Sequence, residues 1–196
     1  MLRWRQVLVL LPLMWLVGCT TSPPSQVHDV CGIFQEKKGW YRDAVKARDK
    51  WGTSIPTMMA FIHQESLCVA DGKPPKKYVL GFIPARRVSS AYGYPQAKDE
   101  TWAHYQRATG NYSHDRDDFG DAVMFIGWYN DQTHRRNKVP KYDAYNLYLA
   151  YHEGHGGYAR GTYLKKPHLQ IVAKKVADQS WRYKTQLDKC EKRLRR

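Results

Sequence analysis

Glu65 is the carboxyl group with the clearest capacity for chemistry in this chain of 196 residues. It lies in the segment IPTMMAFIHQESLCVA, residues 55–70, which has the residue spacing of a short helix. The apolar stripe of that helix contains Met58, Ile62, Glu65 and Val69, flanked by Ile55 and Met59. A carboxyl group among apolar neighbours loses water, which raises its pKa toward neutrality. We therefore expect Glu65 to act as a general acid; the alternative is a structural glutamate.

A second set of residues that could take part in chemistry lies in the segment HEGHGG, residues 152–157. His152 and His155 with Glu153 suggest a zinc site of a cell-wall peptidase or amidase. The spacing argues against it, because the two histidines are three residues apart with Gly154 between them, whereas zinc helices use His-Glu-x-x-His. We expect no metal and no cofactor, and we place Glu153 near the substrate. A second catalytic carboxylate at Glu153, as in a hydrolysing lysozyme, remains an alternative.

Helices are expected to position these groups. Helical spacing covers residues 31–50 (one helix or two), the Glu65 helix, 97–109, 117–130, 142–151 and 167–190. The Glu65 helix has Thr53 or Ser54 as a cap and Pro56 in its first turn. Residues 72–87 contain prolines and a short β-prone run, which predicts a loop or small hairpin over a cleft. The expected fold is mainly α, with at most a small β-hairpin.

The first residues indicate export and lipid anchoring. Arg3 and Arg5 precede an apolar run that ends in Gly18-Cys19, a pattern typical of a bacterial lipoprotein signal. We expect residues 1–18 to be a signal peptide, 19–30 a tether acylated at Cys19, and 31–192 the folded domain. An ordinary cleaved signal or a membrane anchor is the alternative. The expected location is the outer membrane, facing the periplasm.

The net charge of the chain limits the classes of binding partner that we expect. Its formal net charge is +14, and removal of residues 1–18 takes away two arginines and leaves +12. The basic residues are scattered, which is typical of solvated faces and not of a surface that binds nucleic acid. Anionic lipid headgroups and cell-wall carboxylates are the expected attractors.

Three cysteines remain once Cys19 is assigned to lipid. Cys31 and Cys190 lie near opposite ends of the folded part, and chain ends often lie close together, so we expect a Cys31–Cys190 disulfide. Cys68 would then be a buried helical thiol. A Cys31–Cys68 pair is the competing assignment.

The segments HQESL, SSAYGYPQA and LAYHEGHGGY follow one another in this order along the chain. Together they resemble the motifs of soluble lytic transglycosylases, which are lysozyme-like domains that cleave peptidoglycan. HQESL, residues 63–67, resembles their Glu-Ser motif. SSAYGYPQA, residues 89–97, resembles Gly-Ala-x-Gly-Leu-Met-Gln, with Tyr94-Pro95 in place of Leu-Met. LAYHEGHGGY, residues 149–158, resembles Ala-Tyr-Asn-x-Gly, with His152 in place of Asn.

The resemblance implies a lyase with one catalytic carboxyl group. Glu65 would protonate the leaving oxygen and then take a proton from the muramic acid 6-hydroxyl, which closes a 1,6-anhydro ring. Family position places Tyr151 near Glu65 or the scissile sugar. For substrate binding we expect Ser90, Tyr92, Gly93, Gln96, Tyr151 and Glu153, with Gly93 letting backbone approach a sugar and Tyr94 and Tyr158 as further stacking walls. The partner is peptidoglycan; the altered motifs leave an inactive wall-binding lipoprotein as an alternative.

Overall fold

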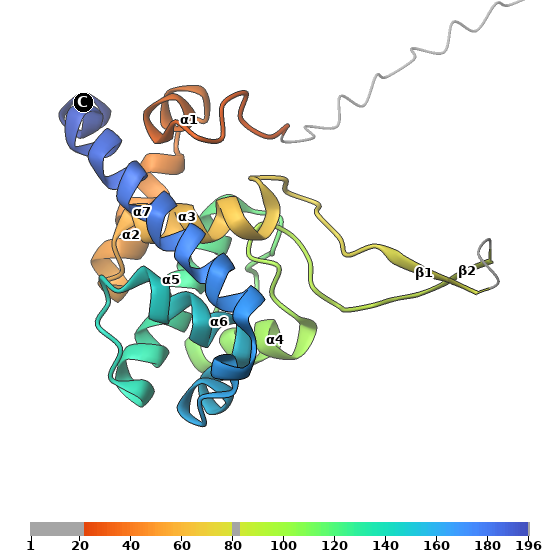
Figure 1. The fold of residues 1–196 in the computed structure, drawn as a ribbon. Helices are drawn as coiled ribbons and strands as arrows, with labels where there is room; N and C mark the ends of the chain where they lie inside the picture. The colour runs from red at the N-terminus through yellow and green to blue at the C-terminus, as the bar shows by residue number, and fades with distance from the viewer. Residues whose placement is uncertain (1–21, 80–82, 196) are drawn as a thin grey trace, which may run out of the picture.

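The described part of the protein is mainly α-helical. The structure, a computed structural model, describes residues 22–79 and 83–195. In chain order its elements are α1 (Val30–Glu36), α2 (Trp40–Trp51), α3 (Ile55–Ser66), β1 (Lys76–Val79), β2 (Ile83–Arg87), α4 (Asp99–Thr109), α5 (Phe119–Asn137), α6 (Ala144–Ala159), the 3-10 helix η1 (Thr162–Lys165) and α7 (Pro167–Leu194) (Figure 1). This architecture confirms the expected fold class.

The helix that carries Glu65, α3, lies at the centre of the helical body. Ser54 caps it by accepting a hydrogen bond from the Thr57 N–H, and Pro56 lies in its first turn. Its residues from Ile55 to Ile62 are buried. The helix ends at Ser66, and the next residue is left-handed. The expected stripe is therefore one turn shorter, because Val69 lies beyond the helix.

The long helices α5 and α7 enclose α3. Helix α7 packs along α3 and α6, and α5 packs against α2, α3 and α6 (Figure 1). Within the range 117–130 that was expected to be helical, four apolar residues at helical spacing are all buried: Phe119, Val123, Ile126 and Tyr129. The Trp40 ring of α2 stacks flat on Phe119, with ring centroids 3.8 Å apart. These contacts join the helices into one hydrophobic core, which holds α3 in a fixed position.

A disulfide between Cys31 and Cys190 joins α1 to the far end of α7. The bond spans 159 residues of sequence, which the chain-entropy account converts to about 5 kcal/mol of stabilisation. This is the pairing favoured by the sequence. Cys68 is a buried free thiol, but it lies in the turn after α3, so its expected helical setting was wrong.

The segment before α1 packs on α7. Tyr183 donates its hydroxyl proton to the Val27 carbonyl, and the Gln186 amide donates to the His28 carbonyl at 3.0 Å. Residues 27 and 28 of the expected tether are therefore held against the folded domain. The predicted signal peptide and Cys19 lie outside the described residues. Within those residues, every helix is too short or too polar to cross a membrane.

Strands β1 and β2 form an antiparallel hairpin, with Lys76 opposite Arg87. This confirms the small hairpin expected within residues 72–87. In Figure 1 the hairpin extends away from the helical body, so the expectation that it covers a cleft was wrong.

Candidate active site

Glu65 opens into a pocket of about 330 Å³ formed where α3 meets α4, α5 and α6. The glutamate lies in the last turn of α3. Tyr129 and Phe125 of α5 and Tyr151 of α6 supply aromatic walls, and Gln96 contributes a polar edge. The pocket thus combines the Glu65 carboxyl group with aromatic surfaces and hydrogen-bonding groups, the composition of a small-ligand site.

The surroundings of Glu65 favour its protonated form. Burial raises the pKa of its carboxyl group to about 7, and a hydrogen bond from Tyr148 acts in the opposite direction. Burial also raises the pKa of Tyr148, so its hydroxyl keeps its proton and acts as a donor. At neutral pH Glu65 is therefore divided between an acid that donates a proton and a carboxylate that accepts one.

Tyr148 and Tyr151 occupy successive turns of the same face of α6. The ring of Phe61, from α3, lies edge-on to both, with ring centroids 5.3 Å away in each case. Tyr151 donates its hydroxyl to the Pro95 carbonyl at 2.6 Å. The sequence placed Tyr151 near Glu65 or the sugar. Tyr151 lies in the wall of the same pocket as Glu65, and burial and then the Glu65 charge raise its pKa. Its hydroxyl donates to Pro95, however, and the hydrogen bond that lowers the pKa of Glu65 comes from Tyr148.

Gly93 serves the protein's own packing. Its φ is +75°, and a Cβ atom there would lie 2.2 Å from the Arg116 carbonyl oxygen. Its N–H donates to the Gly72 carbonyl at 3.0 Å, and the Gln96 side-chain amide donates to that same carbonyl at 2.9 Å. We had expected the absence of a side chain at Gly93 to let its backbone approach a sugar. In the structure the close neighbour of Gly93 is instead the backbone of Arg116. Gln96, in contrast, does line the Glu65 pocket.

Ser90 and Tyr92 lie outside the Glu65 pocket. The Ser90 hydroxyl accepts from the Asp99 N–H at 3.2 Å, at the start of α4. Tyr92 donates to Asp117 at 2.7 Å, and that hydrogen bond is the main cause of its raised pKa of about 12. The cation of Lys73 lies 5.0 Å from the centre of its ring. Both residues hold segments together at a neighbouring surface, so the structure gives neither a place in the pocket.

The other proposed stacking residues are also engaged elsewhere. Tyr94 is buried in the core with its ring 5.5 Å from that of Trp40. Tyr158 donates to Asn146 at 2.9 Å and stacks on Tyr163. The aromatic walls of the pocket come instead from α5 and from Tyr151.

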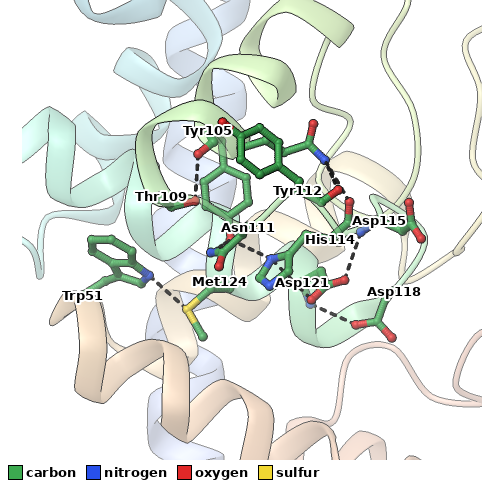
Figure 2. Close-up of polar contacts among 11 residues, drawn as sticks. Trp51, Tyr105, Thr109, Asn111, Tyr112, His114, Asp115, Asp118, Asp121 and Met124 are labelled. Carbon is green, nitrogen blue, oxygen red and sulfur yellow. Dashed lines mark hydrogen bonds and ion pairs between the residues drawn. The ribbon is translucent and has the colours of Figure 1, made fainter.

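A polar network fixes α4 beside α5 (Figure 2). The His114 ring nitrogen Nδ1 lies 2.8 Å from the Tyr105 hydroxyl and 3.3 Å from the Asp121 carboxylate. The Asp115 N–H donates to Asp121 at 2.9 Å. Tyr105 also packs edge-on against Phe125, which lines the pocket. The connection between the two helices therefore holds one pocket wall in place.

Glu153 lines the pocket as an ion-paired carboxylate. Lys166 donates to both of its oxygens, at 2.8 and 3.0 Å, and the Thr162 hydroxyl donates to one of them. These hydrogen bonds lower its pKa to about 2. Gly154 follows with φ 75° and ψ 157°, and this kinks α6. Glu153 therefore stays ionised and ties the kinked end of α6 to η1.

The two histidines of this segment have separate surroundings. His155 stacks on Tyr129 with ring centroids 4.4 Å apart, its Nε2 lies 3.1 Å from the Thr133 hydroxyl, and burial lowers its pKa. His152 is exposed beside Glu153. In residues 22–79 and 83–195 no group of three His, Cys, Asp or Glu side chains is arranged to hold a metal ion. The zinc hypothesis therefore lacks a donor set in this part of the chain.

Sequence reasoning missed Tyr148, Phe125, Tyr129 and Lys98 as residues of the site. Tyr148 had a usable signal, because it lies three residues before Tyr151 and so on the same helical face. Phe125 and Tyr129 carried no such signal, because aromatic residues at helical spacing also fill cores.

Comparison with known families agrees with this geometry. A family model described as Transglycosylase SLT domain matches residues 7–190, which is most of the chain. Searches of curated proteins and of solved structures gave no match.

Proposed function

The chain belongs to the family of transglycosylase SLT domains, and we propose from this membership and from the Glu65 pocket that it is a peptidoglycan lytic transglycosylase. It cleaves the β-1,4 bond between MurNAc and GlcNAc and leaves 1,6-anhydro-MurNAc ends. Glu65 is its single general acid and base. The observation that carries the proposal is a carboxyl group with a pKa of about 7 in a pocket with aromatic walls.

The reaction uses Glu65 twice. In the first step, protonated Glu65 gives its proton to the bridging oxygen while the bond from that oxygen to C1 of MurNAc breaks. In the second step, the Glu65 carboxylate takes the proton of the MurNAc 6-hydroxyl while that oxygen bonds to C1. Glu65 ends protonated, and no water is consumed. Between the steps, the hydrogen bond from Tyr148 stabilises the carboxylate.

The state of Glu153 favours this route over hydrolysis. A hydrolase needs a second carboxylate that is free to activate water or to attack the sugar. Glu153 shares the pocket, but its oxygens accept hydrogen bonds from Lys166 and Thr162. We therefore infer that Glu153 maintains the shape of the pocket and takes no part in bond cleavage. A protein that only binds the wall has no need of a carboxyl group poised near neutrality, so Glu65 also argues against the binding-only alternative.

Digestion of peptidoglycan in water enriched in heavy oxygen tests the reaction type. A transglycosylase gives products without the label, because water is not a reactant. Incorporation of one labelled oxygen at each new end would show hydrolysis and restore Glu153 as a catalytic candidate. Chelator treatment is a companion test, since it would abolish cleavage by a zinc peptidase and leave this reaction unchanged.

We also propose that the protein is anchored to the outer membrane through an acyl chain on Cys19, facing the periplasm. The proposal rests on the charged and apolar pattern of residues 1–18 and on the small residue before the cysteine. Growth with a labelled fatty acid tests it: the wild-type protein should carry label in the membrane fraction, and Cys19→Ser should carry none. Label on the Cys19→Ser protein would refute this assignment.

A further inference from the structure

Lys98 lies at the pocket that holds Glu65, and its cation has no partner among the residues that the structure describes. It is the capping residue of α4, its side chain is exposed, and it lines the same pocket. Among the described residues, its ammonium group takes part in no hydrogen bond or ion pair. Nearby charges differ in this respect, because Lys166 pairs with Glu153 and Asp99 pairs with Arg116 at 2.8 Å.

The charge balance of the pocket makes this cation significant. Two carboxyl groups line the walls. Glu65, with a pKa of about 7, is largely uncharged below neutrality, and Glu153 is neutralised by Lys166. Below neutrality the positive charge of Lys98 therefore has no negative counterpart among the described residues that line the pocket. A concave surface with an uncompensated charge attracts ligand groups of the opposite sign.

Lys98 is separate from the acid and base chemistry. Burial and the Tyr148 hydrogen bond account for the pKa of Glu65. One helical turn after Lys98, Thr101 lines the same wall and adds a hydroxyl group. An ammonium and a hydroxyl group on one turn of α4 form a surface suited to a carboxylate.

We propose that Lys98 is a specificity-determining residue that binds a carboxylate of the glycan strand beside the cleaved bond. The inference rests on the proposed function and specifies which glycan strands the enzyme prefers as substrates. Peptidoglycan offers this chemistry from two sources: the carboxylates of the stem peptides, and the lactyl carboxylate of MurNAc that is freed where a stem has been removed.

Three soluble strand preparations of equal length separate these sources. One keeps its stem peptides with free carboxylates, the second has those carboxylates converted to amides, and the third has lost its stems and exposes lactyl carboxylates. The full chain in detergent is compared with Lys98→Ala and Lys98→Glu. Arg107→Ala is the control, because Arg107 is an exposed cation on the same helix that lies outside the pocket.

We expect the wild-type protein to cleave one of the two carboxylate-bearing strands in preference to the amidated strand, and that strand identifies the source. Lys98→Ala should reduce the preference, measured as a ratio of kcat/KM, by roughly fivefold, the upper range for an ion pair open to solvent. The loss should fall on KM. Lys98→Glu should reduce the ratio further, and Arg107→Ala should keep the wild-type ratio.

An unchanged ratio in Lys98→Ala would overturn the inference, and so would a wild-type protein that cleaves all three strands equally. Failure of the proposed function has a different result, in which no strand is cleaved. In that case the affinities of the three strands for Glu65→Gln, with and without Lys98→Ala, still decide the inference, because binding to Lys98 does not require the reaction.

Discussion

Replacement of Glu65 by glutamine should stabilise the fold at alkaline pH, because the folded protein then no longer buries a carboxylate. The pKa of Glu65 is about 7 in the folded state against an ordinary value of 4.5. The folded state therefore holds the proton more tightly than the unfolded chain. This contribution to stability is complete below about pH 4.5 and is lost as the pH rises through 7, for a total of about 3 kcal/mol.

Urea unfolding at pH 4 and pH 8 measures this difference. The gain in the free energy of unfolding from Glu65→Gln should be about 3 kcal/mol larger at pH 8 than at pH 4. Comparing the two pH values cancels any packing change that glutamine introduces. Glu100→Gln, at an exposed position of α4, is the matched control and should show no such difference. An equal effect of Glu65→Gln at both pH values would refute the claim that Glu65 is held in its protonated form.

Two further predictions concern the pocket and its support. Tyr148→Phe removes the hydrogen bond that lowers the pKa of Glu65, so the alkaline limb of the kcat/KM profile should move up by about one pH unit. Tyr151→Phe is the control and should leave the limb in place, because the Tyr151 hydroxyl donates to Pro95. An unmoved limb in Tyr148→Phe would show that this hydrogen bond does not lower the pKa of Glu65. Gly93→Ala should lower the free energy of unfolding by at least about 2 kcal/mol, because its Cβ would collide with backbone, while Gly110→Ala, where the φ is similar but the space is open, should cost about 1 kcal/mol. Equal losses in the two alanine variants would show that the close backbone approach at Gly93 does not matter.

The sequence predicted the features that depend on local spacing. Residue types at helical intervals were enough to place Glu65 on α3 with its cap, and to give the inward face of α5. The proton-donor environment of Glu65 followed from its apolar neighbours. The Cys31–Cys190 pairing is a long-range exception, and the sequence favoured it for a different reason, since chain ends often lie close together.

The features that depend on long-range contact were not predictable in this way. A sequence shows that residue 93 is glycine, but not that its neighbour is the Arg116 backbone. Periodicity likewise cannot distinguish a tyrosine that fills the core from Tyr148, which reaches a carboxyl group. The segment at Val27 was interpreted from its composition as a tether, but its carbonyl accepts a hydrogen bond from Tyr183, far along the chain.

The central claim is tested most directly by mass spectrometry of peptidoglycan digested with the wild-type protein and with Glu65→Gln. The account predicts 1,6-anhydro-MurNAc ends from the wild type, lighter by one water molecule than hydrolysis products, and none from Glu65→Gln, which still folds and binds glycan. Anhydro ends at the wild-type rate from Glu65→Gln, or no cleavage by the wild-type protein, would contradict it.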